Sequence, residues 1–498
     1  MRDKVVVFYL ALFLRFGWIT GMYFPPHVSP FSLFPDSERY RKISLYIQGK
    51  EDAEDEMLFS GPGYGAFLAL LKNKEYLILR IQAILSAASC VLIMILAEML
   101  FKNRKISLFA GVFSAFSLTS ISLSASILTE TLFFFLLMLS LVLLRKNYLL
   151  SSFFLMLSVF VRPAVIFLPL ILIFFLPRWR ERIVYLLIFY IPVLLWAGRN
   201  KAVHGFFTFS ENGIRTASLY LAGEVLGDFG KVEDKGTSWE KHRRDVERVK
   251  ALFRHPVRTA YFYVKNVILN IFARNELYED EVKASRKFIT PVFQYLWIAF
   301  FFALTIAGIK AGWKEGRQET LFLLSIYLYF ALISGISFLQ NSRLLFPAEP
   351  ARVIFAGIVA GRVWRKEEGE SFPLYIFCGN LISLVPCFLL QIFSSLSPVV
   401  ECLWELAFLA GTPVFWIMSL LWRIKNEFHR KCITFSWLIL VFFYIFYHIS
   451  AFEETTAWIV FLYIVYIPIS VAIMIISYIA GAFLFLLAQG LQKMLFWR

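Results

Sequence analysis

The sequence predicts an all-α polytopic membrane protein, and two observations lead to that prediction. Hydrophobic residues make up 59% of the chain, charged residues only 17%, and the mean hydropathy is +0.68. Soluble domains are about 45–50% apolar and about 25% charged. The apolar residues also occur in runs of about 20, the length at which a helix crosses a bilayer. So much apolar surface does not fit inside one soluble core.

The apolar runs predict the membrane spans in chain order. Clear candidates are the runs at 4–24, 77–100, 107–122, 127–144, 183–198, 291–310, 319–339, 344–362, 373–393, 401–422, 432–449 and 457–489. The stretch 148–176 is ambiguous, because Arg162 and Pro163 interrupt it. Each half has about 14 residues, or about 21 Å as a helix, which is shorter than the ~30 Å hydrocarbon core.

The distribution of charge favours two short spans in 148–176. The basic loops then all lie inside, at 102–105, 145–146, 178–182, 310–317, 362–366 and 423–431. The short outside loops carry no Lys or Arg, at 122–126, 394–400 and 450–456. With a single span, the last three basic loops would lie outside, against the positive-inside rule. We therefore expect about 14 transmembrane helices, both termini in the cytoplasm, and two long extracytoplasmic loops, 25–76 and 199–290.

Charge and cysteine content argue against two other classes of protein. The net charge of +15 would suggest a nucleic-acid partner in a soluble protein. Here most of the excess lies in short loops between spans, where positive-inside retention explains it, so we expect no nucleic acid. The five cysteines lie in or beside apolar runs, which argues against disulfides and a Cys-based metal site. The first apolar run shows no small-residue cleavage site before Pro25, so we expect it to be retained as a span.

The charged stretch 363–372 predicts a division of the chain. It separates a core of about ten spans, 1–365, from a C-terminal block of about four spans, 373–498. The sequence indicates no role for the C-terminal block.

Asp36 is the first candidate for chemistry. It lies in the outer loop 25–76, shortly after the first span, and Glu38, Arg39 and Tyr40 follow it. A carboxylate at this place can act as a general base. Asp followed by Glu and Arg also fits a helix N-cap for the segment 37–48, and both interpretations stay open. The acidic run 51–56 favours a solvated face over a cation site.

Other charged residues lie at the outer ends of spans. Glu130 begins the run 127–144, where it either faces a polar cavity or complements a helix N-terminus. Arg162, Arg199 and Arg343 suit either snorkelling to the membrane surface or binding of a phosphate. The six histidines show no metal-ligand spacing, and the chain has neither a phosphate-cradling glycine loop nor a nucleophile elbow.

Short motifs follow one another through 1–365, at 36–40, 61–64 with 68–71, 129–133, 160–163, 196–200, 254–256 with 261–265, and 343–350. In their order and sidedness they resemble the membrane-integral glycosyltransferases of family 39 type, in the GT-C superfamily. That group includes protein O-mannosyltransferases and the aminoarabinose transferases of lipid A. Ser37 separates Asp36 from Glu38, where the family often has paired acids. This departure leaves open which acid is the base and what the acceptor is.

The resemblance implies a glycosyltransferase in the plasma membrane with its active site outside. The donor would be a polyprenyl-phosphate sugar and the acceptor a hydroxyl of a lipid, glycan or protein. Transfer would invert the anomeric carbon, with Asp36 as the base. Glu130 would hold the acceptor, or bind a divalent cation such as Mg²⁺ or Mn²⁺ together with Asp36, although two acids are too few to demand one.

The resemblance also implies roles for further residues. The donor phosphate would be bound by Arg199 and Arg343, with Arg162 as a third candidate. Substrate contacts would come from Glu38, Arg39, Tyr40 and Tyr64. The loop 199–290 would cover the cavity, and its basic and aromatic residues suit either an anionic acceptor or a solvated helix face, at Trp239, Lys241, Arg243 and Arg244.

Two other functions remain as alternatives. A flippase or transporter of lipid-linked saccharides would share the span number and the arginines, but it would be expected to show internal repeats or broken helices, which the sequence does not indicate. A glycan polymerase or ligase would share the lipid-phosphate chemistry, but it would place its key arginines and its large loop late in the chain.

Overall fold

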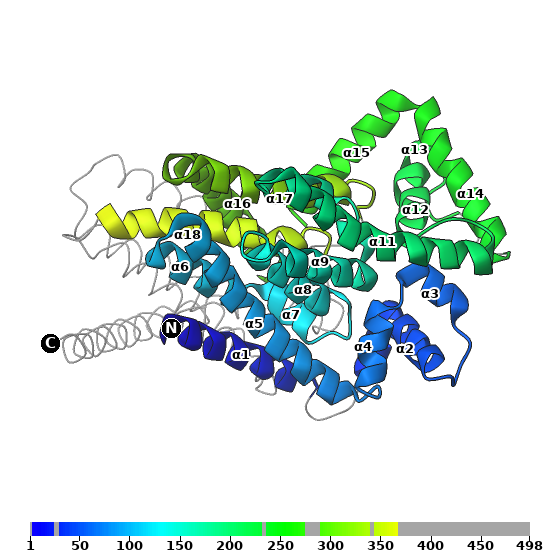
Figure 1. Cartoon of the computed structure of the whole chain (residues 1–498), viewed down its shortest axis with the longest axis horizontal. Coiled ribbons are helices and arrows are strands. Elements are labelled where there is room, and N and C mark those ends of the chain that lie inside the picture. Colours follow the sequence, from blue (N-terminus) through cyan, green and yellow to red (C-terminus); the bar gives the residue numbers. More distant parts are fainter. Residues whose placement is uncertain (1, 24–28, 232–235, 274–288, 339–342, 367–498) are drawn as a thin grey trace, which may run out of the picture. The chain divides into compact units, whose positions relative to one another are not determined.

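The computed structural model describes residues 2–23, 29–231, 236–273, 289–338 and 343–366, and every regular element in these ranges is a helix (Figure 1). The predicted all-α class is confirmed for this part of the chain. The chain divides into two units, Met1–Arg365 and Lys366–Arg498. The spans expected at 373–393, 401–422, 432–449 and 457–489 lie outside the described residues.

The first half of the described chain holds the helices α1 Arg2–Tyr23, η1 Pro30–Leu33, α2 Pro35–Ile47, α3 Glu54–Ser60, α4 Gly63–Leu70, α5 Glu75–Phe101, α6 Arg104–Ala115, α7 Leu118–Ser124, α8 Glu130–Leu143 and α9 Tyr148–Val161. The middle holds η2 Pro163–Val165, α10 Leu168–Leu172, η3 Ile173–Phe175, α11 Trp179–His204, α12 Asn212–Thr216, η4 Ala217–Ala222 and α13 Gly223–Leu226. The last part holds α14 Ser238–Ala251, η5 Leu252–Arg254, α15 Pro256–Ile271, α16 Ile289–Glu315, α17 Arg317–Ser334, η9 Phe346–Ala348 and α18 Glu349–Lys366.

Two helices of the described residues, α5 and α11, are long and apolar enough to cross a membrane. A third candidate is the pair α6 and α7, if the two count as one bent span. The apolar helices α8 and α9 are shorter, at 14 residues each. These helices support membrane association, as the composition predicts.

The run 107–122 does not form the unbroken helix that the sequence predicts. α6 ends at Ala115, and α7 continues at an angle of 53°. Ser117 caps α7 by accepting a hydrogen bond from the backbone N–H of Ser120 at 3.3 Å. The buried guanidinium of Arg15 in α1 donates to the Ala115 carbonyl at 3.3 Å and to the Ser120 hydroxyl at 2.9 Å. The expectation of no broken helix is therefore wrong here, because side chains satisfy the backbone groups that the break exposes.

The interruption predicted at Arg162 and Pro163 is confirmed. α9 ends at Val161, and Arg162 has an extended backbone, with φ −149° and ψ 120°. Proline disfavours a helical conformation in the residue before it. The break leaves Arg162 at the end of α9 rather than within a continuous helix.

The bundle helices pack in a chain of neighbours, with α1 on α5 and α6, α5 on α8, α8 on α9, and α9 on α11. One core cluster, between α1, α5 and α6, consists mostly of small side chains, Val7, Ala11, Ala87, Cys90, Met94 and Ala115. Small residues let helix backbones approach closely, which drives helix association where lipid surrounds the bundle.

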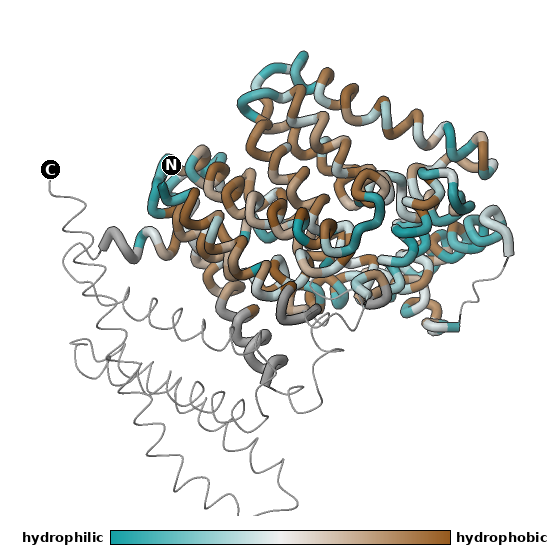
Figure 2. The backbone as a smooth tube through the Cα atoms, turned by 90° about the horizontal axis from the view of Figure 1, so that it is seen from below, coloured by the Kyte–Doolittle hydropathy of each residue, from teal (hydrophilic) through white to brown (hydrophobic). Residues whose placement is uncertain are grey.

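The described parts of both long loops form helices of their own, α2 to α4 within 25–76 and α12 to α15 within 199–290. In Figure 2 most of the bundle helices consist mainly of hydrophobic residues, and the hydrophilic segments gather mainly near one end of the unit. α4 lies against the end of α9, where a Cβ added at Gly63 would stand 2.6 Å from the Phe160 carbonyl. This close approach places the outer helices beside Arg162.

Candidate functional site

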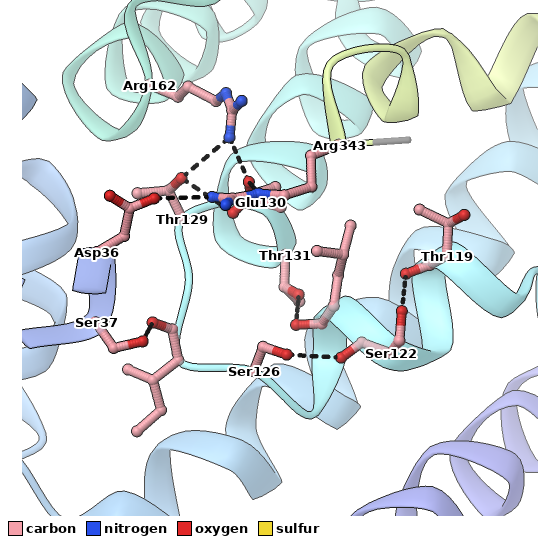
Figure 3. A network of polar contacts seen from close by, with 12 residues as sticks. Asp36, Ser37, Thr119, Ser122, Ser126, Thr129, Glu130, Thr131, Arg162 and Arg343 are labelled. Carbon is pink, nitrogen blue, oxygen red and sulfur yellow. Dashed lines mark hydrogen bonds and ion pairs between the residues drawn. The ribbon is translucent and has the colours of Figure 1, made fainter. Parts of the chain in front are cut away.

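Four charged side chains from separate segments meet at one place (Figure 3). Asp36 comes from the first turn of α2, Glu130 from the first residue of α8, Arg162 from the end of α9, and Arg343 from the turn before η9. We call these four residues the Asp36–Glu130 cluster. All of them are residues that the sequence singles out.

Glu130 is the most enclosed member, with a side chain only 1% exposed. Its Oε1 accepts from Arg162 Nη1 at 2.5 Å and from Arg343 Nε at 2.6 Å. The Thr129 hydroxyl donates to its other oxygen at 3.2 Å. A buried carboxylate is stable only when it is paired and hydrogen-bonded, and two guanidiniums meet that need. Glu130 begins α8, as the helix N-terminus interpretation predicts, and its burial is balanced by paired guanidiniums.

Arg343 joins the two acids. Its Nε contacts Glu130, and its Nη2 donates to Asp36 Oδ2 at 3.3 Å. Lysine, with a single ammonium, could not reproduce this two-sided arrangement, because the guanidinium presents donors on separate nitrogens in a planar fork. Arg343 thus fixes the relative position of two carboxylates that lie 94 residues apart in sequence, 36 and 130.

Asp36 is the more open acid, with a side chain 33% exposed. α2 begins at Pro35, with Phe34 as its N-cap residue, so Asp36 lies inside the first turn. The alternative in which Asp36 caps this helix is therefore wrong. Proline at the first position supplies a suitable φ without losing a hydrogen bond, and this starts the helix one residue before the acid.

Arg39 gives the site an excess of positive charge. Its Nη1 lies 3.1 Å from Asp36 Oδ1, and its guanidinium stacks over the Phe59 ring at 4.4 Å. Arg39, Arg162 and Arg343 therefore face only two carboxylates. An anionic group that entered beside Asp36 would therefore meet net positive charge.

Tyr40 of α2 and Tyr64 of α4 pack against each other among the outer helices. Their rings pack edge to face with centroids 5.0 Å apart, and both side chains are buried. Burial, together with the negative charges of Asp36 and Glu130, raises the pKa of Tyr40 to about 12. Burial likewise raises the pKa of Tyr64 well above its usual value. Both phenols therefore stay neutral at physiological pH.

The loop between α7 and α8 is held from two sides, and this sets the position of Glu130. The Ser37 hydroxyl donates to the Ile127 carbonyl at 2.8 Å. Gln82 of α5 donates to the Ser126 carbonyl at 2.7 Å and accepts from the Tyr64 hydroxyl at 2.6 Å. The neighbours of Asp36 therefore also fix the segment that carries the second acid.

Arg199 does not contact the Asp36–Glu130 cluster. It forms an ion pair with Glu54 of α3 and stacks over Trp196 at 5.1 Å. Glu54 also accepts from the Tyr46 hydroxyl at 2.6 Å and lies 3.3 Å from His204 Nε2. We call Tyr46, Glu54, Arg199 and His204 the Glu54–Arg199 cluster.

The pKa of Glu54 reflects this pairing. Burial alone would raise the pKa of its carboxyl, but the hydrogen bonds from Arg199 and Tyr46 outweigh burial, so the pKa lies below the usual 4.5. The acidic run 51–56 is thus not a uniformly solvated face, because Glu54 ties α3 to the end of α11.

Glu38 and Asp36 have different ion-pair partners. It forms a two-bond pair with Arg41, at 2.6 and 2.9 Å, and remains 43% exposed. It also lines a cavity of about 340 Å³ with Ser29, Phe31, Arg41, Asn73 and Glu75. Asp36 and Glu38 therefore face different surroundings although one residue separates them.

No group of three or more His, Cys, Asp or Glu side chains is placed to hold a metal ion within the described residues. Arg343 contacts both Asp36 and Glu130, and a guanidinium repels a cation at the same oxygens. These two acids therefore fit arginine pairing better than a divalent cation.

The basic and aromatic residues singled out in 199–290 lie on α14. Trp239 and Arg243 are exposed, and Arg243 pairs with Glu247 on the same helix at 3.1 Å. Lys241 and Arg244 are only partly exposed, so a solvated helix face describes Trp239 and Arg243 but not the whole set.

Sequence reasoning missed two buried residues that hold the site. Arg15, fully buried in an apolar helix, and Gln82, fully buried in α5, each brace the chain between α6 and α8. A signal was present in both cases, since a strongly polar side chain within an apolar span is costly unless it has a specific partner.

No protein-family model matches the chain, and the curated proteins yield no match either.

Proposed function

We propose that the protein is an integral membrane glycosyltransferase with about 14 spans in the plasma membrane. It would move a sugar from a polyprenyl-phosphate donor to a hydroxyl acceptor on the extracytoplasmic side. The observation that carries the proposal is the Asp36–Glu130 cluster. It combines a partly exposed carboxylate, a buried carboxylate and an excess of guanidinium groups, and it draws them from four separate segments.

The chemistry follows from the demands of a single displacement. The acceptor oxygen forms a bond to the anomeric carbon while the bond from that carbon to the phosphate oxygen breaks. Asp36 takes the hydroxyl proton, a transfer that contributes typically 10²–10⁴-fold to rate. Polyprenyl phosphate leaves with the electron pair of the broken bond, and the anomeric configuration inverts.

The arginines suit the leaving group. The phosphate gains negative charge as the bond breaks, and preorganised cations stabilise that charge without reorganising. We assign this role to Arg343 and Arg162, because Glu130 holds both guanidiniums in place. Arg39 extends the positive charge past Asp36. We assign Arg199 the role of a tether, because it pairs with Glu54.

A second candidate is a flippase or transporter of lipid-linked saccharides. The bend of 53° between α6 and α7 favours it, since discontinuous helices often build transport sites. The same arginines would then bind the lipid phosphate without any bond being broken.

Turnover of the donor separates the candidates. Purified protein in nanodiscs would be given polyprenyl-phosphate sugars with membrane lipid and glycan extracts as acceptors, and wild type would be compared with Asp36→Asn. The transferase proposal expects release of polyprenyl phosphate and a loss of about 100-fold or more in the variant. A matched control is Glu56→Gln, on α3.

Equal turnover by wild type and Asp36→Asn would overturn the assignment of the base. If neither protein consumes a donor but the wild type moves it across a reconstituted bilayer, the transporter is the better account.

A further inference from the structure

Helix α15, Pro256–Ile271, exposes an apolar stripe. Val257 is 84% exposed, Tyr261 64%, Val264 53% and Ile268 52%. Spacings of three and four residues place these side chains on one face of the helix. The stripe is extended at one end by Phe253, which is 84% exposed.

The opposite face of α15 packs inward. Phe262 and Tyr263 lie against a buried apolar cluster, and the polar side chains of Asn266 and Asn270 are buried. Asn270 donates to the carbonyls of Ser334 and Ser337 at 2.8 and 2.7 Å. Asn266 donates to Glu224 at 2.8 Å, and the Tyr263 hydroxyl donates to the Leu332 carbonyl at 2.6 Å. The last carbonyls of a helix have no partner within that helix, so Tyr263 and Asn270 cap the C-terminal end of α17. Asn266 ties α15 to α13.

α15 therefore carries an apolar stripe on the face that it turns away from the rest of the protein. A surface helix in water turns its apolar stripe to the core and its polar face outward. Here the hydrogen bonds and apolar contacts of the opposite face hold that face inward, so the stripe cannot turn to the core without losing them. An apolar stripe held outward in this way indicates apolar surroundings.

The place of α15 in the fold indicates what those surroundings are. It caps the end of α17, which covers most of the predicted span 319–339, so it lies at the level where a span ends. Two exposed basic residues lie at the N-terminal end of the stripe, Arg254 at the end of η5 and Arg258 in the first turn of α15, and Tyr261 lies in the stripe. Basic and aromatic side chains beside an apolar stripe are typical of helices that lie in the membrane interface.

We propose that α15 lies flat on the phospholipid bilayer, with its apolar stripe at the boundary between headgroups and acyl chains. Arg254 and Arg258 then face lipid phosphates. α15 would serve as a membrane-surface anchor for the helices of 199–290, whichever reaction the protein carries out.

Fluorescence quenching tests the proposal. The full-length protein, as Val257→Cys or Ile268→Cys, would be labelled with an environment-sensitive dye and placed in phospholipid nanodiscs. The signal of the unsubstituted chain, labelled in parallel, is subtracted to remove the native cysteines. Arg243→Cys is the matched control, because that residue lies on the polar helix α14 with a side chain 72% exposed.

The proposal expects quenching of both stripe labels by spin-labelled lipid. It also expects quenching by aqueous iodide to be about fivefold weaker at the stripe than at position 243, given an insertion depth of about 5–10 Å. Iodide quenching equal to the control would overturn it, because the stripe would then face water. Shielding from iodide without quenching by lipid would also overturn it, because protein would then cover the stripe.

Discussion

The Asp36–Glu130 cluster and the Glu54–Arg199 cluster both join an outer helix to the end of a bundle helix, but they differ in charge balance. In the first, three guanidiniums face two carboxylates, and one carboxylate is almost fully enclosed. In the second, one guanidinium faces Glu54, and Asp55 lies 4.0 Å from His204. Only the first arrangement has cationic charge to spare for an anionic ligand. An arginine at a span end is therefore not by itself a sign of phosphate binding.

The largest difference between the two clusters should appear in stability. Glu130→Gln leaves Arg162 and Arg343 without their buried partner, so we expect a loss of about 3–5 kcal/mol in the free energy of unfolding. Glu54→Gln should cost much less, because that pair is partly open to solvent. Thermal unfolding in detergent measures both. Equal losses for the two variants would contradict the ranking.

The next effect concerns the geometry of the arginine fork. Arg343→Lys keeps the charge but cannot contact Glu130 and Asp36 from two separate nitrogens, so we expect donor turnover to fall by about 100-fold. Arg317→Lys, at the start of α17, is the control. A fall of less than about threefold at position 343 would mean that positive charge alone suffices.

A backbone contact offers a smaller effect. Gly63→Ala would set a Cβ 2.6 Å from the Phe160 carbonyl, so α4 must shift away from α9. We expect a loss of about 1–3 kcal/mol, the usual cost of overpacking. Gly198→Ala is the matched control, since a Cβ there meets nothing within 4 Å. Similar unfolding temperatures for the two variants would argue against a tight crossing.

The smallest effect is a dependence on pH at the Glu54–Arg199 cluster. The pKa of Glu54 lies below 4.5 in the folded protein, so its pairing stabilises the fold above that pH and is lost as pH falls through the folded pKa. We expect about 1 kcal/mol for this partly exposed pair. Unfolding of wild type and Glu54→Gln from pH 3 to pH 7 should converge at the acid end. If the stabilities of the two proteins differ by the same amount at every pH, the ionisation of Glu54 does not contribute to folding.

The sequence predicts the helical class and the break at Arg162 well, because both depend on neighbouring residues in the chain. Long apolar runs indicate helices, and proline disfavours a helical conformation in the residue before it. It also singles out Asp36, Glu130, Arg162 and Arg343 as separate residues. It could not predict which of them meet, since Arg343 and Asp36 lie 307 positions apart. The pairing of Arg199 with Glu54 was hidden for the same reason.

Missed breaks have a different cause. The bend after Ala115 is held by Arg15, a side chain from another helix that donates to the Ala115 carbonyl and to the Ser120 hydroxyl. Hydropathy alone treats 107–122 as one run, because the mean hydropathy of the stretch stays apolar despite its serines. Tertiary hydrogen bonds of this kind override local pattern.

The most direct test of the central claim is the affinity of each cluster for a lipid phosphate. A short-chain, water-soluble prenyl phosphate would be titrated by calorimetry into nanodiscs that carry wild type, Arg343→Gln or Arg199→Gln, after thermal unfolding confirms that each variant is folded. We predict that Arg343→Gln weakens binding by about tenfold or more, the worth of one charge-assisted contact, and that Arg199→Gln changes it by less than about twofold. Weaker binding in Arg199→Gln with unchanged binding in Arg343→Gln would contradict the assignment of the Asp36–Glu130 cluster as the phosphate site.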